Sequence, residues 1–274
     1  MTAVPAPDRP IDIRDPSSPL YIRVDGAVGR LLINRADKRN ALSQAMWEAV
    51  PVALDLLEAE AGVHVIILGS AVDGIFCAGA DLAELKAIAG DADRCEANRR
   101  AIRAAQQRLL YSPKPVIAAI PGACVGGGCG LALHADLRVA SRRARFGITP
   151  AKIGLVYPLS DTRRVVELAG MAGASRLLLT AALIPADEAK SMGLVDFVHE
   201  DADFDGAVAD LADKIAGLSP FSLKAVKATI RSVANGQLDE DAESIRLFLE
   251  AHTGPDATEG IAAFLDKRTP RFTS

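Results

Sequence analysis

Two glycine-containing turns carry the residues best placed to do chemistry. One turn is FCAGADL (Phe76–Leu82) and the other is GACVGGGC (Gly122–Cys129). Each follows an apolar run typical of a strand and opens a run typical of a helix, a geometry that points unpaired backbone N–H groups toward an incoming anion or carbonyl oxygen. Together the two turns predict an oxyanion hole. Taken singly, either is explained as well by glycines that permit close helix–strand packing.

A phosphate-binding loop is not indicated at either turn. The pattern GxxxxGK[ST] is missing from the sequence, and Gly126-Gly127-Gly128 does not fit GxGxxG. The nucleotide-binding interpretation is therefore disfavoured.

Composition excludes other classes of function. Half of the 274 residues are hydrophobic and 24% are charged, as expected of a globular protein with a sizeable core. The formal charge of -4 lacks the basic surplus that nucleic acid binding requires. No apolar run approaches the roughly 20 residues that span a bilayer, and the first residues have no signal-peptide core. We therefore expect a cytoplasmic protein with no nucleic acid or membrane partner.

Metal binding is also not indicated. The cysteines have no CxxC spacing and the histidines are scattered without ligand spacing, so we expect small buried thiols and no zinc site or disulfide framework. The residues concerned are Cys77, Cys95, Cys124, Cys129, His64, His134, His199 and His252.

The elements that must position the two turns follow from the apolar pattern. Leu20–Val24 and Val28–Ile33 flank Asp25-Gly26, which predicts a β-hairpin. Ser43 can cap a helix with Pro51 as a kink. Further expected elements are strands at 63–68, 116–120, 137–140 and 195–198 and helices at 81–110, 127–133, 185–193, 205–218, 221–234, 238–252 and 257–266.

Repetition of strand, turn and helix predicts an α/β fold with a mostly parallel sheet. Residues 1–19 contain five prolines among polar residues and are expected to form a loose tail. Residues 20–200 are expected to form the α/β core, and residues 201–274 a helical C-terminal region.

Several motifs in order resemble the enoyl-CoA hydratase/isomerase (crotonase) superfamily. They are NRADKRNAL at 34–42, FCAGADL at 76–82, PVIAAIPGACVGGG at 115–128, DLRVAS at 136–141, IPADEAKSMGLVDFV at 184–198 and FLDKR at 264–268. The resemblance covers nearly the whole chain after Pro19 and implies a spiral core of stacked ββα units. It also implies a helical C-terminal region that builds a trimer or a dimer of trimers.

The resemblance also implies roles for individual residues. The N–H groups of Ala78 and Gly127 would hold the oxygen of an acyl-CoA thioester, which enters as substrate, with no separate cofactor. The coenzyme A channel would be lined by Lys38, Arg39, Ala41, Ala80, Asp81, Leu82 and Gly126. Phe264 and Lys267 would reach the adenine and the 3′-phosphate, commonly from a neighbouring subunit. For the lysines and Arg39, a solvated surface charge is the alternative interpretation.

Two positions depart from the family pattern. Hydratases of this family carry glutamates where this chain has Gly130 and Pro150. Neither residue can transfer a proton through its side chain, so hydration or isomerisation would need another carboxylate. Asp161, Glu84 and Asp136 are the nearest by sequence, with Asp161 more simply explained as a helix cap and the other two as surface or structural groups.

One branch of the superfamily matches this departure. Residues 149–157 (TPAKIGLVY) resemble methylmalonyl-CoA decarboxylases, in which the residue at the position of Tyr157 helps to orient the substrate carboxylate. Loss of CO₂ delivers the enolate directly, so no base is needed. A core tyrosine is the alternative for Tyr157, and the branch retains a glutamate where this chain has Gly130.

Three functions therefore remain open. The favoured one is an acyl-CoA enzyme that stabilises a thioester enolate and decarboxylates a carboxyacyl-CoA. The others are hydration or isomerisation through a non-standard acid/base, and an acyl-CoA-binding protein with little catalytic activity.

Overall fold

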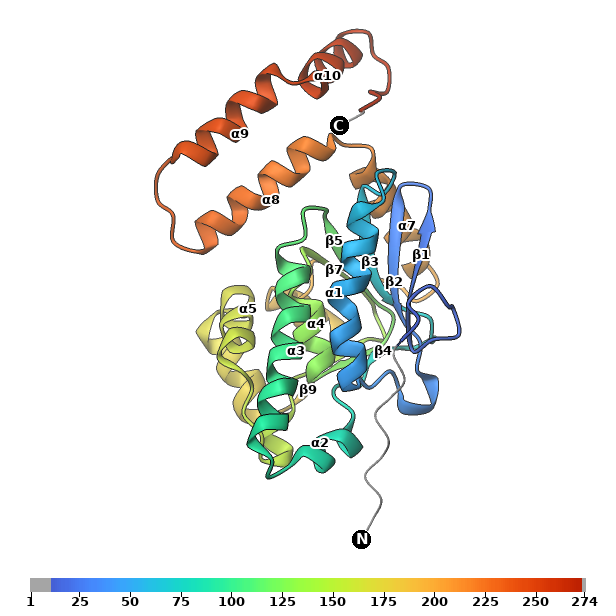
Figure 1. Cartoon of the computed structure of the whole chain (residues 1–274), viewed down its shortest axis with the longest axis vertical. Coiled ribbons are helices and arrows are strands. Elements are labelled where there is room, and N and C mark those ends of the chain that lie inside the picture. Colours follow the sequence, from blue (N-terminus) through green and yellow to red (C-terminus); the bar gives the residue numbers. More distant parts are fainter. Residues whose placement is uncertain (1–10, 273–274) are drawn as a thin grey trace.

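The computed structural model describes residues 11–272, which form two sheets with helices around them (Figure 1). The six-stranded sheet contains, in spatial order, β1 (Leu20–Asp25), β2 (Val28–Ile33), β3 (Val65–Ser70), β5 (Val116–Ile120), β7 (Leu137–Ser141) and β10 (Phe197–His199). The four-stranded sheet contains β4 (Ile75–Cys77), β6 (Ala123–Val125), β8 (Arg145–Gly147) and β9 (Leu183–Pro185). Only the β1–β2 and β8–β9 pairs within these two sheets are antiparallel.

The helices follow the strands along the chain. They are α1 (Gln44–Ala59), α2 (Leu82–Ile88), α3 (Ala92–Leu110), α4 (Gly127–Leu133), α5 (Leu159–Thr180), α6 (Ala186–Ser191), α7 (Phe204–Ala216), α8 (Pro220–Ala234), α9 (Ala242–Thr253) and α10 (Pro255–Leu265). Two short 3₁₀ helices are η1 (Ala36–Lys38) and η2 (Pro150–Ile153). None of these helices is both long and apolar enough to cross a membrane.

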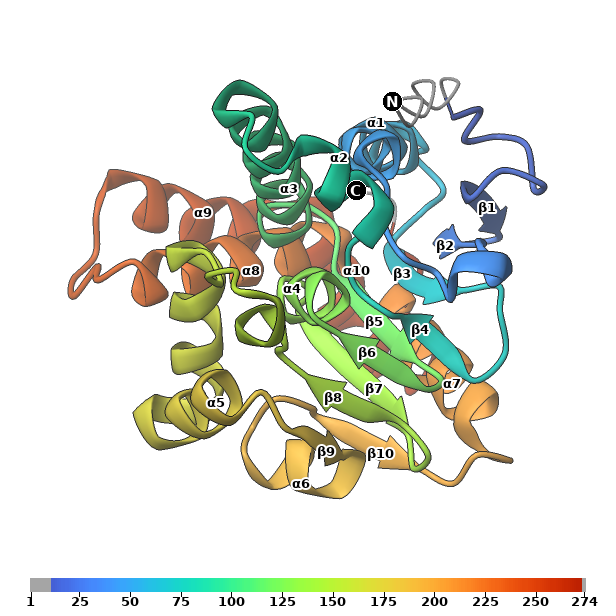
Figure 2. The ribbon, with the colours of Figure 1, turned by 90° about the horizontal axis from the view of Figure 1, so that it is seen from below.

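The chain winds as a spiral of ββα units. In each unit one strand enters the six-stranded sheet, the next enters the four-stranded sheet, and a helix follows, as in β3–β4–α2, β5–β6–α4 and β7–β8–α5. Figure 2 shows the two sheets lying one against the other. The α/β class and the spiral of ββα units are thus confirmed.

Burial explains why the six-stranded sheet forms. Its central strands are apolar on both faces, as a parallel sheet covered on both sides requires. One face packs on α7 through Phe204 and Val208, and the other contributes to the core that contains Trp47 of α1. The α1 helix is capped by the Ser43 side chain, which accepts a hydrogen bond from the Met46 N–H, and it continues through Pro51.

Two sequence expectations about elements were incomplete. A single helix from 81 to 110 was predicted, but α2 and α3 are separate because Gly90 adopts a φ of 85° between them. The four-stranded sheet was not anticipated from the residues, because each of its strands has three residues, too few to display a periodic pattern.

The N-terminal segment is partly described. Residues 1–10 of the predicted tail lie outside the described residues. Ile13 is 7% exposed, its carbonyl accepts a hydrogen bond from the Ile22 N–H at 2.7 Å, and Asn34 Nδ2 donates to the Pro16 carbonyl. Residues 11–19 therefore pack against the hairpin. The division of the chain at residues 19 and 200 stays a prediction.

The C-terminal helices are attached to the core through a buried ion-pair cluster. Lys227 Nζ of α8 lies 2.6 Å from Asp136 Oδ2, and Arg231 Nη2 lies 3.1 Å from Asp136 Oδ1. Lys227 also donates to the Lys114 carbonyl, while Asp136 accepts from the Val116 N–H. Asp136 is therefore a structural group, which is one of the two interpretations (surface or structural) that the sequence left open for it.

Replacing Lys227 by methionine should destabilise the fold by about 1.5–3 kcal/mol, because two hydrogen bonds of a buried cation are lost while Asp136 keeps Arg231. Urea unfolding measures the change. Lys224→Met is the control, since Lys224 is exposed on the same helix. Equal stability of the two variants would contradict the structural role of the cluster.

Candidate active site

A large cavity lies at the end of the strands where both glycine turns meet. Its volume is about 580 Å³, within the usual range for small-molecule sites. Its walls come from α2, α3, the turns at 78–80 and 126–127, and residues 149–161. Apolar and polar side chains both line it, and the polar ones include Gln106, Tyr157 and Asp161.

The two turns approach each other closely because their glycines adopt positive φ. Gly79 has a φ of 112° and Gly126 a φ of 54°. A Cβ atom at Gly79 would stand 3.2 Å from the Val125 carbonyl oxygen, and one at Gly127 would stand 3.6 Å from the Ala80 nitrogen. The main chains at Ala80 and Gly127 therefore lie side by side along the cavity wall.

The expected donor Ala78 was wrong. Its N–H already donates to the Arg39 carbonyl at 3.1 Å, so it is not available to a ligand. The Gly79 N–H that follows donates to Cys77 Sγ at 3.4 Å, whereas the Ala80 N–H donates no hydrogen bond within residues 11–272. The Gly127 N–H belongs to the first residue of α4 and has no partner in its own helix. The available pair of donors is therefore Ala80 and Gly127.

Three side chains occupy the space beside Gly130. A Cβ at Gly130 would stand 2.9 Å from Gln106 Nε2, 3.1 Å from the Tyr157 hydroxyl and 3.7 Å from Asp161 Oδ1. They come from α3, the segment before α5, and α5. The place where the family pattern carries a glutamate is thus taken by a different set of polar groups, including a carboxylate.

Asp161 is a buried acid and not a helix cap. It is the third residue of α5, whose N-cap is Pro158. The side chain is 3% exposed, and burial raises the pKa of Asp161 to about 6, with Gln106 and Arg103 opposing part of this shift. In the described structure neither Asp161 Oδ1 nor the Gln106 amide makes a hydrogen bond of good geometry. Such a group titrates close to the pH range in which general acids and bases work best.

His134 lies behind Asp161. Its Nε2 is 4.0 Å from Asp161 Oδ1, and its Nδ1 is 2.6 Å from the Gly130 carbonyl, to which it donates. Burial lowers the pKa of His134 to about 4, so the imidazole is neutral at neutral pH. A neutral imidazole leaves Asp161 without a counter-ion at this contact.

Tyr157 has features of both sequence interpretations, because it packs against the core and also lines the cavity. Its hydroxyl donates to the Gly126 carbonyl at 3.5 Å and lines the cavity. Burial raises the pKa of Tyr157 well above its usual range, so the phenol stays protonated. Its one proton points to the Gly126 carbonyl over a long 3.5 Å contact, so it could serve an oxygen in the cavity only by leaving that contact.

The other candidate carboxylates lie elsewhere. Glu84 Oε2 accepts the Gln44 N–H at 2.7 Å at the start of α1, and Asp136 belongs to the ion-pair cluster under α8. Neither lines the cavity.

Of the residues predicted to bind coenzyme A, some line the cavity and others only support the turn beside it. Ala80, Leu82 and Gly126 line the cavity, and Leu82 is 62% exposed at its mouth. The Asp81 carboxylate has a structural role, because it caps α2 and pairs with Arg35 at 2.8 Å.

Lys38, Arg39 and Ala41 lie in the segment beside the first turn. Lys38 ends η1, and the Arg39 φ of 52° brings its carbonyl to the Ala78 N–H. The Ala41 carbonyl accepts a hydrogen bond from Arg35. These residues fix the turn, and the cavity as described does not include them.

Phe264 and Lys267 lie far from the cavity in a single copy of the chain. They belong to α10 and the residues after it, at the opposite end of the molecule from α2 (Figure 1). Phe264 is 83% exposed. Neither residue lines the cavity of its own chain.

The cysteines are free thiols, three buried and Cys95 exposed at the cavity. Within the described ranges no three His, Cys, Asp or Glu residues gather as metal ligands would.

Comparison with known proteins gives a consistent result. A family model described as enoyl-CoA hydratase/isomerase matches residues 23–274. The short-chain-enoyl-CoA hydratase of Clostridium acetobutylicum is 32% identical over 252 residues, 91% of this chain and 95% of that protein. The peroxisomal Delta(3,5)-Delta(2,4)-dienoyl-CoA isomerase of Arabidopsis thaliana is 34% identical over 260 residues, 90% and 93% of the two chains. The crystal structure of an enoyl-CoA hydratase/isomerase family protein from Hyphomonas neptunium superposes with a TM-score of 0.90 at 41% identity, covering 93% and 97% of the two chains.

Proposed function

The chain belongs to the enoyl-CoA hydratase/isomerase family, and from this premise we propose that it moves a proton on an enoyl-CoA thioester, with Asp161 as the acid/base. Relatives named as a hydratase and as an isomerase match at similar identity, so the family alone does not select the reaction. The observation that carries the proposal is the buried Asp161 carboxylate beside Gly130, where the family pattern has a glutamate.

The thioester oxygen is placed between the N–H groups of Ala80 and Gly127. Both groups lack a protein partner in the described chain, and both residues line the cavity. Donors aimed at an oxygen that gains charge contribute roughly 3–4 kcal/mol each to the transition state. The positive end of α4 adds to this effect, although the helix has only seven residues.

One carboxylate suffices for isomerisation of a double bond. Ionised Asp161 takes a proton from the α carbon of a 3-enoyl thioester, which lies between the carbonyl group and the double bond. The electron pair moves to the thioester oxygen, and a dienolate forms. The same carboxyl then returns the proton to the far end of the conjugated system, giving the 2-enoyl thioester. No atom is gained or lost, and no cofactor takes part. Hydration would use Asp161 to activate water and would need a second proton delivery at the α carbon.

Decarboxylation is the second candidate, and it is supported by the position of Tyr157. Its neutral hydroxyl lines the cavity and, by leaving the 3.5 Å contact with the Gly126 carbonyl, could donate to the carboxylate of a carboxyacyl-CoA. Ionised Asp161 next to Tyr157 would repel that carboxylate, which makes isomerisation or hydration the favoured chemistry.

We further propose that copies of the chain form a trimer or a dimer of trimers. Large apolar side chains are exposed on the C-terminal helices, as expected of a surface that another copy covers. They include Phe248, Leu249, Ile261, Phe264 and Leu265, which are 55–83% exposed. In such an assembly Phe264 and Lys267 would come from a neighbouring subunit to the adenine end of coenzyme A.

The proposal is tested by incubating the protein separately with 3-hexenoyl-CoA, crotonyl-CoA and methylmalonyl-CoA and following each thioester by mass spectrometry. Conversion of 3-hexenoyl-CoA to its 2-enoyl isomer without mass change supports isomerisation, and gain of water by crotonyl-CoA supports hydration. Loss of CO₂ from methylmalonyl-CoA alone would favour the decarboxylase. Binding of all three without conversion would indicate a binding protein.

A further inference from the structure

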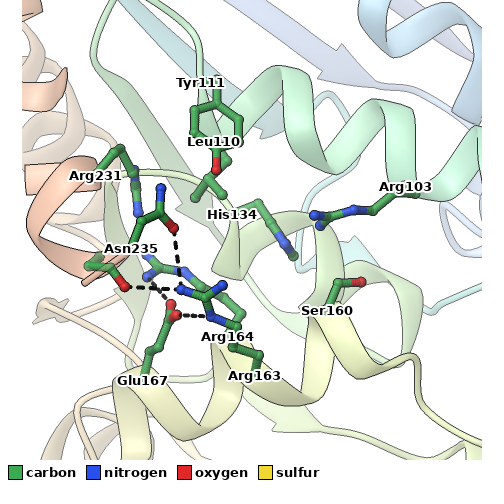
Figure 3. Close-up of a pocket in the computed structure, with 11 residues that line it drawn as sticks. Arg103, Leu110, Tyr111, His134, Ser160, Arg163, Arg164, Glu167, Arg231 and Asn235 are labelled. Carbon is green, nitrogen blue, oxygen red and sulfur yellow. Dashed lines mark hydrogen bonds and ion pairs between the residues drawn. The ribbon is translucent and has the colours of Figure 1, made fainter. Parts of the chain in front are cut away.

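A second, smaller cavity lies behind the candidate active site. Its volume is about 60 Å³, and it is surrounded by α3, α5, α8 and the end of α4 (Figure 3). Four arginines line it, namely Arg103, Arg163, Arg164 and Arg231. The one carboxylate in its lining is Glu167, so the cavity carries a surplus of positive charge.

Three of the four arginines have partners. Arg163 and Arg164 both pair with Glu167, at 2.7 and 3.2 Å, and Arg231 pairs with Asp136. Arg103 forms no hydrogen bond or ion pair with the described residues. Figure 3 shows its side chain directed toward His134 and Ser160, with no interaction drawn to any neighbour.

Arg103 and Ser160 are the two residues that line both cavities. They come from α3 and from the first turn of α5, one residue before Asp161. Both side chains are able to donate hydrogen bonds to a ligand, and the guanidinium group can hold a carboxylate through two parallel bonds. The wall between the cavities thus presents a cation and a hydroxyl just beyond the proposed proton-transfer group.

We propose that the acyl chain of the substrate ends in a carboxylate and that Arg103, with Ser160, binds this carboxylate. The inference rests on the proposed function, since the thioester oxygen between Ala80 and Gly127 sets the direction in which the acyl chain runs past Asp161. Ile102 and Pro158 also line the cavity in this region and supply apolar surface for the methylene groups between the two ends.

Charge favours this assignment over a plain hydrocarbon chain. A hydrocarbon end would cover the partly buried Arg103 guanidinium group without giving it a hydrogen-bond acceptor, which costs free energy. A carboxylate compensates Arg103 and gains from the field of Arg164 and Arg231 behind it. Asp161 repels a carboxylate when ionised, so the substrate group has to lie on the Arg103 side of the wall.

The test compares glutaconyl-CoA, a five-carbon 2-enoyl thioester with a terminal carboxylate, with the neutral 2-hexenoyl-CoA. Wild-type protein should bind the acidic thioester about 10- to 100-fold more tightly in calorimetric titration, the range of a charge-assisted hydrogen bond. Arg103→Gln should abolish this preference by weakening the acidic thioester, with the neutral one little changed. Arg100→Gln is the control, since Arg100 is exposed on the same helix, pairs with Glu96 and does not line either cavity.

Equal binding of the two thioesters by the wild-type protein would overturn the proposal and leave the proposed function standing. Equal losses for both thioesters in Arg103→Gln, with a shifted pH–rate profile, would show instead that Arg103 tunes Asp161. A preference for the acidic thioester that depends on Arg103, in a protein that converts neither these thioesters nor 3-hexenoyl-CoA, would support this inference and reject the proposed function.

Discussion

Asp161→Asn is expected to lower turnover of the enoyl-CoA substrate by about 10²- to 10⁴-fold, the usual contribution of a positioned acid/base. Asparagine fills the same space but cannot exchange a proton, and no other carboxylate lines the described cavity to replace it. Thioester binding should change little, because Ala80 and Gly127 hold the oxygen through the main chain. Single-turnover assays and calorimetric binding of the substrate separate the two effects.

The pH dependence gives an independent check. Because burial raises the pKa of Asp161 to about 6, kcat/KM of an isomerisation that begins with the ionised carboxylate should fall as pH drops through about 6. An ordinary aspartate would lose its charge about two pH units lower. A profile that is flat from pH 5 to 7 would exclude Asp161 as the base.

Stability should move in the opposite direction to activity. The folded-state pKa of Asp161 lies above its unfolded value, so its contribution to stability is fully present below about pH 4 and is lost as pH rises through about 6. At pH 8 the buried charge therefore costs up to about 3 kcal/mol, and Asp161→Asn should unfold at a higher urea concentration than wild type. Loss of turnover together with loss of stability would instead point to a structural role.

Gly122→Ala is expected to destabilise the protein by at least about 4 kcal/mol, in the exceptional range for a single substitution. A Cβ at Gly122 would stand 1.7 Å from the Gly74 carbonyl oxygen and 2.2 Å from its carbonyl carbon. Both contacts are backbone atoms, so no side chain can move aside. The connections β3–β4 and β5–β6 would have to separate, which breaks the parallel pairing of β4 with β6.

Urea unfolding of the purified variant, or its failure to accumulate as a folded monomer or oligomer, measures this effect. Gly206→Ala is the matched control, because no atom lies within 4 Å of a Cβ at this exposed position in α7. That change should be neutral or stabilising by up to about 1 kcal/mol, since alanine favours helices. Similar stability of the two variants would show that the connections near Gly122 can adjust.

The family resemblance located the fold and the wall of the site but misplaced one donor. FCAGADL and GACVGGGC do meet at the cavity, as the strand–turn–helix pattern predicted. The pattern could not tell which N–H of the first turn stays free, because the Ala78 amide is taken by the Arg39 carbonyl, 39 residues earlier in the chain. The available signal for the free donor was the position of Ala80 directly after Gly79, the glycine that adopts a positive φ.

The sequence favoured a helix cap for Asp161, and this interpretation was wrong for a similar reason. A carboxylate near the start of a helix is commonly a cap, and only the burial of α5 against α3 and Gly130 turns this one into an acid with a raised pKa. Arg103 had no sequence signal at all, since it stands among many charged residues on an amphipathic helix.

The sequence alone established the strand–turn–helix order and the glycines that let the two turns approach. It also showed directly that positions 130 and 150 carry no glutamate. Tertiary structure alone decided which amides remain unpaired, which carboxylate is buried away from water, and which arginine forms no hydrogen bond or ion pair in the described chain. The physical reason is that hydrogen-bond satisfaction and desolvation depend on neighbours far apart along the chain, and no spacing rule encodes them.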